Sequence, residues 1–334
     1  MKNLSLSIKI NFFIIITFYI FALLADILAP YTPFESNSKR IAYSPPIHIR
    51  FNFKDKFYFK RFELKINHDE LERDFIESKQ KCHINLFKLD NKIRLLYSPD
   101  CPKEMNFFGT DRLGRDYFSR LLYGLRPSLF SAILGIIISF PFGVILGTIS
   151  GYFKGLTDRI LMRIVELILS FPSFYMLIIL AGLLPPKISN FDRLMLITMI
   201  LSFIGWAGLA RIVRGQVLSI SEREFVKSAE LAAVPKWKII IREIIPQLST
   251  YLIINLMLSF PVYILGETAL SFLGLGINQP DPSLGNLLAE GRDINNLFLR
   301  PYLGIIPILI LILITAACNN LSDAFRNIFD IKAN

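Results

Sequence analysis

Six long apolar segments divide this chain of 334 residues and restrict it to a protein that crosses a membrane several times. Their lengths are close to the roughly 17–25 residues that a helix needs to cross a bilayer core of about 30 Å. With 53% hydrophobic residues and a mean hydropathy of +0.47, the chain is more apolar than a soluble domain of this length. The expected fold is an all-α polytopic membrane protein with six transmembrane helices. The segments are 10–29, 129–150, 160–184, 194–209, 248–272 and 302–317.

The excess of positive charge follows the pattern of membrane proteins. The formal net charge is +10, and Lys and Arg gather beside the ends of the apolar segments. Short cytoplasmic loops accumulate these residues, whereas long external loops escape the bias. We therefore expect both termini in the cytoplasm and the lipid membrane, rather than nucleic acid, as the partner of this charge. The clusters are Lys2 and Lys9; Lys154, Arg159 and Arg163; the basic residues of 211–242; and Arg326 and Lys332.

The first apolar segment has the basic start and apolar middle of a signal peptide. No small-residue cleavage pattern follows it, because Asp26 precedes two prolines and Pro30 comes directly after Ala29. We therefore predict a retained anchor, in which residues 1–30 form a cytoplasmic tail and the first transmembrane helix. Residues 323–334 are predicted to form a second cytoplasmic tail.

Residues 31–105 are not membrane-like and are predicted to form a small α/β insertion on the outer side of the membrane. Alternating apolar residues predict strands over 47–53 and 57–66, the second interrupted by a bulge. The charged segment 68–81 contains neither Gly nor Pro and favours a helix, whereas 86–97 fits a hairpin.

Two of the three cysteines lie in this insertion. Cys82 and Cys101 are 19 residues apart, and Cys318 lies at the end of the last apolar segment. A disulfide between the first two would suit an oxidising outer compartment. Their spacing does not show that they approach one another, so a disulfide and two free thiols both stay open.

Turn-forming residues mark the segment 106–127, which leads into the second apolar segment. Asp111 and Gly114 favour turns, and Asp116 can cap a short helix with an apolar and a charged face. Such a helix fits an interfacial element that precedes the membrane core, predicted over 128–322. A simple entry helix without a partner is the alternative.

The polar segment 211–247 separates the fourth and fifth apolar segments and carries several helix signals. Ser221 and Glu224 have the spacing of a capping box, so a helix is expected to begin there. Pro235 stands where a second helix would begin, and Pro246 is expected to end it. Two short helices facing the cytoplasm would suit docking onto a soluble partner.

No enzyme constellation is present in the sequence. The three histidines, His48, His68 and His83, lack the spacing of metal ligands, and the cysteines form no paired motif. There is no GxxxxGK[ST] phosphate loop, so ATP and Mg²⁺ would have to be bound by another subunit. We therefore predict that the chain is not an enzyme and binds no cofactor or metal of its own.

Ionisable residues within the apolar segments are sparse, which disfavours an autonomous proton- or ion-coupled carrier. Arg163 and Glu166 lie three residues apart on one helix face, where an ion pair near the cytoplasmic end is preferred over a relay. For Glu267, lining a pathway and hydrogen bonding to a neighbouring helix both stay open.

Three motifs occur in order along 107–330. They are FGTDRLGRD with SRLLYGLRPSL, the loop EREFVKSAELAAVPKWKIIIREIIP, and ALSFLGLG with PSLGNLLAEGR. Together they resemble the permease subunits of bacterial oligopeptide, dipeptide and nickel ABC importers, in particular the C-type member of the permease pair. The resemblance implies the six-helix type I (MetI-like) fold in the bacterial cytoplasmic membrane. It also implies a second permease, two cytoplasmic ATPases and an extracytoplasmic peptide-binding protein as partners.

By this resemblance, the polar segment 211–247 is a coupling loop that inserts into an ATPase subunit. Three of its residues are expected to pack against the ATPase, and two alanines to keep the two short helices close together. The ATPase is expected to contact Phe225, Ser228 and Ala229, and the two alanines between the helices are Ala232 and Ala233. The full set of coupling residues is Glu224, Phe225, Lys227, Ser228, Ala229, Ala232, Ala233 and Pro246.

Three features depart from the family pattern. Lys227 stands where the family often has Glu, so that Glu224 or Glu230 becomes the candidate for a carboxylate contact. Ala233 stands where the family often has Gly. The insertion 31–105 is longer than in many relatives, and docking of the binding protein and a cap without a contact role both stay open.

The predicted function is ATP-driven import of oligopeptides or dipeptides, in which this chain forms half of the translocation pathway. Nickel or another small solute is the alternative cargo, although no His-rich or Cys-rich tract favours it. An autonomous secondary transporter and a membrane-anchored scaffold are rival functions. The first would need ionisable residues in mid-membrane, and the second would leave the charged loop unexplained.

Overall fold

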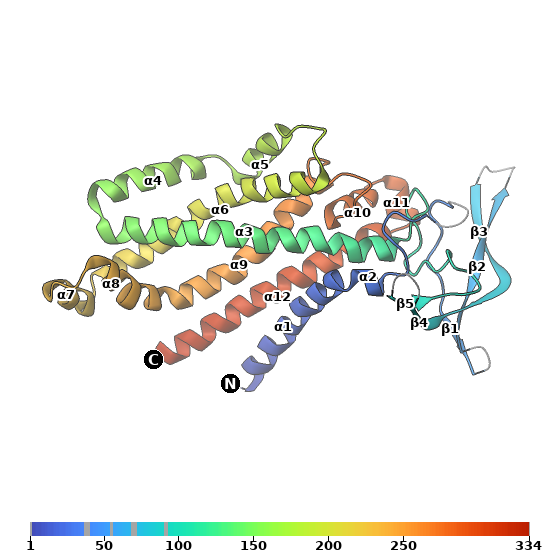
Figure 1. Ribbon diagram of the computed structural model, residues 1–334, viewed down its shortest axis with the longest axis horizontal. Coiled ribbons are helices and arrows are strands. Elements are labelled where there is room, and N and C mark those ends of the chain that lie inside the picture. Colours follow the sequence, from blue (N-terminus) through green and yellow to red (C-terminus); the bar gives the residue numbers. More distant parts are fainter. Residues whose placement is uncertain (1, 37–40, 54–55, 68–71, 90–92, 334) are drawn as a thin grey trace. The chain divides into compact units, whose positions relative to one another are not determined.

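The computed structural model describes residues 2–36, 41–53, 56–67, 72–89 and 93–333, and Figure 1 labels its elements. The chain divides into two compact units, each described by itself below. The first, here the helix unit, comprises Met1–Ile15, Phe130–Leu270 and Leu311–Asn334. The second, here the sheet unit, comprises Ile16–Leu129 and Ser271–Ile310.

Long apolar helices dominate the described chain. Five of them are long and apolar enough to cross a membrane, and a bent pair of helices raises the number to six. The prediction of a polytopic helical protein with a small sheet-containing insertion is therefore confirmed. The five are α1 (Lys2–Leu23), α3 (Tyr117–Phe153), α6 (Asn190–Ser221), α9 (Ile245–Phe272) and α12 (Tyr302–Ala333), and the pair is α4 (Gly155–Ser170) with α5 (Ser173–Gly182).

A proline explains the bent pair. The axes of α4 and α5 differ by 79°, and Pro172 lies in the break between them. The ring of a proline disfavours helical backbone in the residue before it, and Phe171 is extended, with φ −89° and ψ 134°. The third apolar segment is therefore two helices joined at a sharp bend rather than one straight helix.

The helix predicted after Asp116 begins where the sequence indicates but is not a separate element. It continues from Tyr117 to Phe153 as α3, so that the predicted interfacial helix and second span form one helix. The Asp116 carboxylate accepts hydrogen bonds from the amide and the hydroxyl of Ser119, at 2.7 and 2.6 Å, and so caps the helix start.

Antiparallel strands build the insertion. The strands β1 (Arg50–Asn52), β2 (Lys56–Asn67) and β3 (Glu72–His83) form one sheet in that order, and β4 (Asn85–Leu89) and β5 (Ile93–Tyr97) form a hairpin. The strands predicted over 57–66 and the hairpin over 86–97 are present. The register of β2 against β3 shifts between Lys60 and Phe62, where a bulge is expected.

The helix predicted over 68–81 is wrong. Residues 68–71 lie outside the described part of the chain, and 72–81 belong to strand β3. Pairing with β2 overrides the helical propensity of this charged segment, because it sets Cys82 directly opposite Phe59 and buries both side chains completely. The described part of the insertion is thus mainly β rather than α/β.

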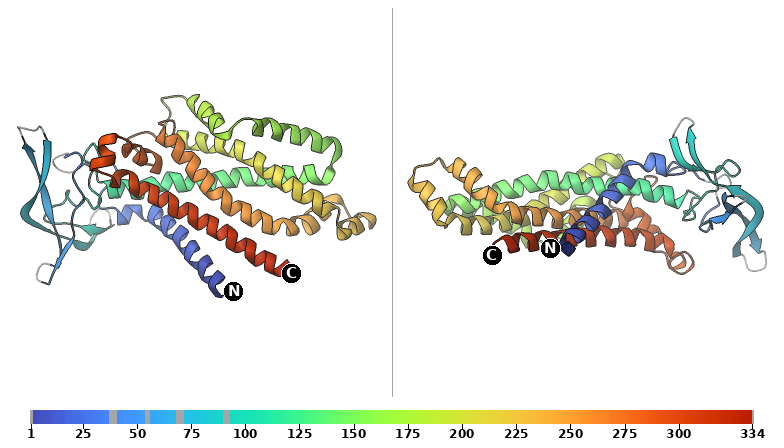
Figure 2. Two further views of the ribbon diagram at one scale, coloured as in Figure 1. Left: turned by 180° about the vertical axis from the view of Figure 1, so that it is seen from behind. Right: turned by 90° about the horizontal axis from the view of Figure 1, so that it is seen from below.

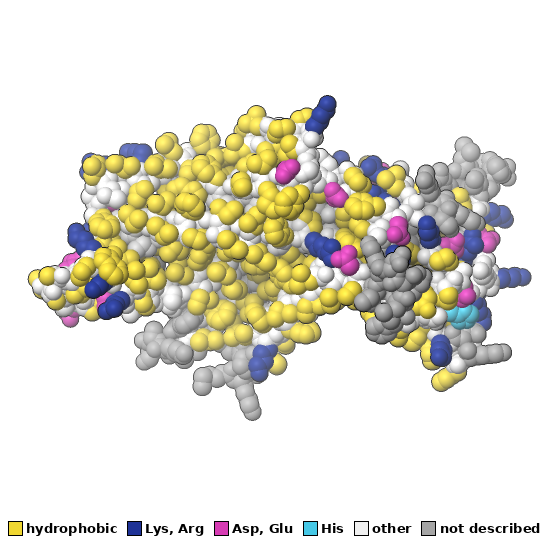
Figure 3. Space-filling view, in the orientation of Figure 1, with side chains coloured by type: hydrophobic (Ala, Val, Ile, Leu, Met, Phe, Trp, Pro, Cys, Tyr) yellow, Lys and Arg dark blue, Asp and Glu magenta, His cyan; other side chains and the backbone are white. Residues whose placement is uncertain are grey.

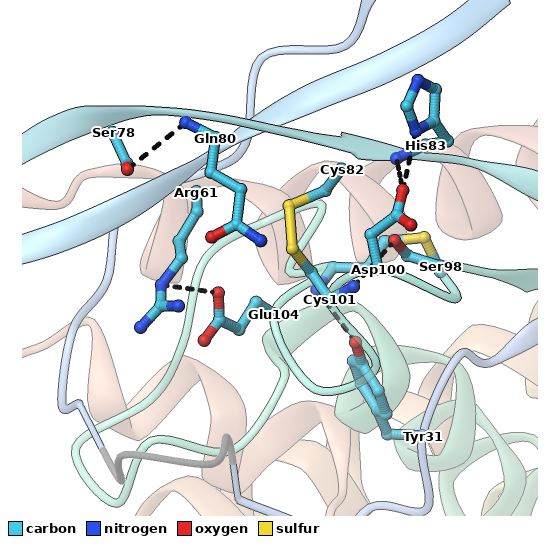
Figure 4. Close-up of a disulfide and its surroundings, with 11 residues drawn as sticks. Tyr31, Arg61, Ser78, Gln80, Cys82, His83, Ser98, Asp100, Cys101 and Glu104 are labelled. Carbon is cyan, nitrogen blue, oxygen red and sulfur yellow. Dashed lines mark hydrogen bonds and ion pairs between the residues drawn. A yellow bond between two sulfur atoms is a disulfide. The ribbon is translucent and has the colours of Figure 1, made fainter.

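A disulfide lies in the core of this insertion (Figure 4). The sulfur atoms of Cys82 and Cys101 are bonded at 2.01 Å, within a cluster of buried residues that includes Phe59 and Met105. The hydroxyl of Tyr31, in the same cluster, accepts a hydrogen bond from the amide of Met105 at 2.8 Å. The disulfide therefore links strand β3 to the chain that leads into α3.

Buried charges join distant segments within the sheet unit. The guanidinium of Arg120 is fully buried and donates hydrogen bonds to the carbonyls of Pro33 and Pro280, at 3.2 and 3.1 Å. It also donates to Oε1 of Gln279 at 2.9 Å and lies 3.4 Å from the Asp111 carboxylate. The first and third motifs of the sequence therefore meet here.

Glu290, in the short helix α10 (Leu284–Glu290), belongs to the same buried cluster. Its side chain is 8% exposed and accepts a hydrogen bond from Nε2 of Gln279 at 3.0 Å. Burial, and secondly the charge of Asp111, raises the pKa of Glu290 from 4.5 to about 7, although Arg120 opposes the shift. The protonated carboxyl is thus favoured in the folded chain at mildly acidic pH.

We expect the sheet unit to be more stable at pH 5 than at pH 8. A carboxyl whose folded pKa is raised contributes stability that is complete below about pH 4.5 and is lost as the pH rises through about 7. The difference is on the order of 2–3 kcal/mol. Hydrogen exchange of α10 at both pH values measures it, and Glu290→Gln should reduce the dependence, leaving the part due to buried Asp116, whose pKa burial also raises to about 7. An equal pH dependence in this variant would contradict the assignment to Glu290.

Candidate functional site

The predicted coupling loop is a pair of short helices between α6 and α9 (Figure 1). Helix α7 spans Glu224–Leu231 and helix α8 spans Lys236–Ile239. Pro235 immediately precedes α8, as the sequence indicates. The single π-helical turn η1 (Ile240–Ile244) then joins α8 to α9 without a break.

Two of the expected helix boundaries are wrong. Ser221 is the last residue of α6 and its hydroxyl donates to the carbonyl of Leu218 at 2.9 Å, so it forms no capping box with Glu224. The burial of Val217 and Ile220 holds α6 helical up to this point. Pro246 does not end a helix either, because it lies in the first turn of α9, after a π-helical turn.

Buried apolar side chains fix α7 and α8 to the helix unit. Val226 of α7 and Ile239 of α8 are almost fully buried in one cluster with Val217 of α6 and Leu248 of α9. Ala229 is half-buried and packs against this cluster. The sequence interpretation missed Val226, although its spacing of three residues from Ala229 on α7 marks an apolar helix face.

Four apolar side chains of the pair and of the turn between its helices are exposed, and we name them the docking surface after the role that the resemblance implies: Phe225, Leu231, Val234 and Trp237. Leu231 is 89% and Trp237 60% exposed. Hydrophobic and charged side chains mix at this end of the helix unit in Figure 3. Leu231 and Trp237 were not singled out from the sequence, because a polar segment with isolated apolar residues does not show which of them are exposed.

The predicted site residues lie on α7, in the turn that follows it and at the start of α9. Most of them are exposed, in contrast to the half-buried Ala229. Ala233 lies in the turn between α7 and α8 with a φ of +54°, a left-handed backbone that favours glycine. The exposed residues are Glu224, Phe225, Lys227, Ser228, Ala232, Ala233 and Pro246.

Polar contacts brace the two short helices against the end of α3. The hydroxyl of Tyr152 donates to Oε1 of Glu230 at 2.9 Å, and Lys154 forms an ion pair with Glu222. The ammonium of Lys236 lies 5.5 Å from the ring centre of Phe153. Tyr152 and Phe153 at the end of α3 thus contact α7 and α8, and Lys154, directly after α3, contacts the segment between α6 and α7.

These contacts bear on which carboxylate, Glu224 or Glu230, is the candidate for a contact with the ATPase. Glu224 and Glu230 are both exposed, but Glu230 accepts a hydrogen bond from Tyr152, so Glu224 becomes the preferred candidate. Lys227 lies 3.0 Å from Glu222, and hydrogen bonds from Lys154 and Lys227 lower the pKa of Glu222 to about 2. The Glu222 carboxylate therefore stays ionised over the physiological pH range.

The remaining charged candidates lie away from the docking surface. Arg163 and Glu166 form an exposed pair on α4 at 3.4 Å. A second pair, the bidentate contact of Arg214 with Asp158, connects α6 to α4. Glu267 is completely buried within α9.

The chain is similar to known transport proteins over most of its length. Residues 143–333 match the family described as binding-protein-dependent transport system inner membrane component. The oligopeptide transport system permease protein OppC of Mycobacterium bovis is 37% identical over 229 residues, 69% of this chain and 77% of the relative. OppC of Haemophilus influenzae is 40% identical over 68% of this chain and 70% of the relative. The dipeptide transport system permease protein DppC of Bacillus subtilis is 39% identical over 57% and 58%.

These matches confirm the family resemblance read from the three motifs. The family model covers more than half of the chain, and the relatives are transport permeases rather than enzymes. The apolar helices of the described chain agree with an integral membrane protein. The chain belongs to the MetI-like family of binding-protein-dependent inner membrane components and is a permease subunit of an ABC importer.

Proposed function

We propose that this chain is one of two permease subunits in an ATP-driven importer of oligopeptides or dipeptides. The observation that carries the coupling role is the pair α7–α8, which is anchored by Val226 and Ile239 and presents an apolar docking surface. Relatives that carry oligopeptide and dipeptide in their names support the cargo class. ATP and Mg²⁺ would be bound by two partner ATPases, and residues 128–322 would form the permease core.

The braced contacts suggest how force would be transmitted. When the ATPases close around ATP, α7 and α8 would move with the groove that holds them. Tyr152, Lys154 and Phe153 would pass this movement to α3, and the Arg214–Asp158 pair would carry α4 along with α6. The two permeases would then shift between inward-facing and outward-facing populations.

The helix unit also supports an orientation of the chain in the membrane. Both termini and α7–α8 belong to the helix unit, and in both views of Figure 2 helices α1 and α12 run in the direction of α7–α8 as they approach the termini. Because the ATPases are cytoplasmic, we propose that the termini are cytoplasmic as well. Residues 31–105 would then face the outside, where a disulfide is chemically favoured.

The test is reconstitution of the assembly. The chain is co-expressed with its partner permease and ATPases, purified in mild detergent and placed in vesicles with the binding protein. We expect stoichiometric recovery of the ATPases and uptake of alanine peptides of two to five residues that requires ATP. A lone stable protein, or uptake without ATPases, would contradict the proposal.

We further propose that the insertion docks the extracytoplasmic binding protein. Phe51 on β1, Phe57 on β2, and Ile49 and Phe53 on either side of β1 are exposed apolar residues, with Phe53 95% exposed. The ring of Phe51 lies 5.5 Å from that of Phe53 and 5.1 Å from that of Phe57. Clustered aromatic side chains of this kind are typical of protein interfaces. Exposed Lys56 beside Phe57 favours an acidic partner surface.

We expect the triple variant Phe51→Ser, Phe53→Ser, Phe57→Ser to lower binding-protein-stimulated ATP hydrolysis by about tenfold or more, as loss of central interface residues does. Leu86→Ser is the matched control, because Leu86 is 66% exposed on the other sheet. Labelling of free thiols checks that the Cys82–Cys101 bond still forms. Unchanged stimulation in the triple variant would leave the insertion a cap without a docking role.

A further inference from the structure

A cavity of about 330 Å³ opens between α3, the α4–α5 bend, α6 and α9, all within the helix unit. Its wall is apolar except for neutral hydrogen-bonding groups. None of the described residues that line it is Asp, Glu, Lys, Arg or His. The polar and smallest members of the wall are Ser139, Ser173, Gly208, Asn255, Ser259 and Tyr263.

Tyr263 is held in place as part of the wall. Its hydroxyl donates to Oγ of Ser139 at 2.5 Å. A methyl group added at Gly205 would lie 2.5 Å from that hydroxyl, and one at Gly135 would overlap the ring. The two glycines on α3 and α6 therefore provide the space that the ring occupies.

Helix α9 carries a regular row of polar residues into this cavity. Tyr251, Asn255, Ser259, Tyr263 and Glu267 follow at every fourth position of an otherwise apolar stretch. Residues four positions apart lie on nearly the same face of a helix, so the row forms a continuous stripe. Three consecutive members of it, 255, 259 and 263, line the cavity.

We propose that this cavity is the part of the translocation pathway contributed by this chain, and that its neutral polar groups contact the main-chain amides of the peptide. The inference rests on the proposed import of peptides. The polar contact residues lie on α3, α5 and α9, and the feature of the cargo that they meet is its main chain. All peptides share the main chain, so a wall of this kind accepts side chains of either charge.

The physical reason is a balance between entry and release. A peptide amide that leaves water without a hydrogen-bond partner is destabilised, so a purely apolar wall would exclude it. A fixed charge in the wall would retain cargo of opposite charge and reject cargo of like charge. Hydroxyl and amide groups make individually weak contacts, which suits a site that must both bind and release.

Gly208→Phe tests the position of the pathway. A Cβ atom added at Gly208 meets no atom within 4 Å in this chain, and Gly208 lines the cavity, so we expect a larger side chain there to enter the cavity. We expect uptake of alanine peptides to fall about tenfold or more, as when a ring fills a binding site. Gly215→Phe is the matched control, because Gly215 lies on the same helix, is equally open and lies outside the cavity wall.

The recovery of partners separates a pathway from a packing surface. If Gly208→Phe loses the partner permease during purification while Gly215→Phe keeps it, the cavity is filled by a partner helix and the inference is overturned. Normal uptake by Gly208→Phe would overturn it too. If the wild-type complex takes up none of the peptides, the proposed function itself fails, and that result is distinct from both.

Ser259→Asp tests contact with the cargo. Uptake of a lysine-containing alanine peptide, divided by that of its aspartate-containing counterpart, should rise about 25-fold relative to wild type. Attraction of the lysine and repulsion of the aspartate each contribute about fivefold, the effect of unit charges about 4 Å apart in water. Dividing by the wild-type ratio removes the preference of the binding protein. Ser249→Asp is the control, because both serines donate to a backbone carbonyl of α9, but Ser249 lies outside the cavity. An unchanged ratio for Ser259→Asp would overturn the assignment.

Discussion

Replacing Leu231 by Asp is expected to abolish ATP-driven uptake, with binding of the ATPases weakened about 30-fold or more. This corresponds to the loss of a central interface residue of at least about 2 kcal/mol. Leu231 is 89% exposed at the end of α7, so the substitution leaves the anchors Val226 and Ile239 in place. The aspartate would have to lose its hydration to enter an apolar groove, which is unfavourable.

Recovery of ATPase subunits with the affinity-purified permease measures this effect. Leu231→Met keeps an apolar side chain of similar volume and should retain both recovery and uptake. Ala229→Arg is a less specific probe, because Ala229 packs against the buried cluster and its replacement would also unseat α7. Normal recovery of ATPases with Leu231→Asp would show that the docking surface has been misplaced.

The location of the short helices α7 and α8 could be predicted from the sequence, whereas which of their side chains are buried and which are exposed could not. The polar interruption between two apolar segments and Pro235 mark where α7 and α8 lie. Which residues point inward depends on contacts with α3, α6 and α9, so Val226 as an anchor and Leu231 as an exposed residue emerge only from the packed structure. The contact between Tyr152 and Glu230, 78 residues apart, likewise has no local signal.

Two of the three errors in secondary structure have related causes. Ser221 and Glu224 satisfy the local rule for a helix start, but the buried face of α6 extends that helix to Ser221. The charged segment before Cys82 satisfies the local rule for a helix, but pairing of β3 with β2 buries Cys82 in the insertion core. In both places long-range burial outweighs local preference, and the strongly periodic membrane segments avoid this conflict.

Arg120→Met is expected to destabilise the sheet unit by about 3–5 kcal/mol, the typical cost of removing one partner from a buried ion pair. The guanidinium contacts carbonyls from the segment after α2 (Ala25–Leu28) and from the segment before α10. Without it, the buried Asp111 loses one of its two arginine neighbours. Hydrogen exchange of α10 and of the first turn of α3 measures the loss.

Arg163→Met provides the matched control. Arg163 pairs with Glu166 on the exposed surface of α4, where side chains 75% and 60% exposed make a pair worth less than about 1 kcal/mol. Arg120→Lys should fail to restore stability, because one ammonium cannot reproduce the planar geometry that reaches Pro33, Pro280 and Gln279 together. Equal stability of Arg120→Met and Arg163→Met would mean that apolar packing alone holds these segments. The three acceptors come from two segments about 250 residues apart, one at Pro33 and the other at Gln279 and Pro280. Arg120 of the first motif contacts both, and through Gln279 and Pro280 it ties the first motif to the third.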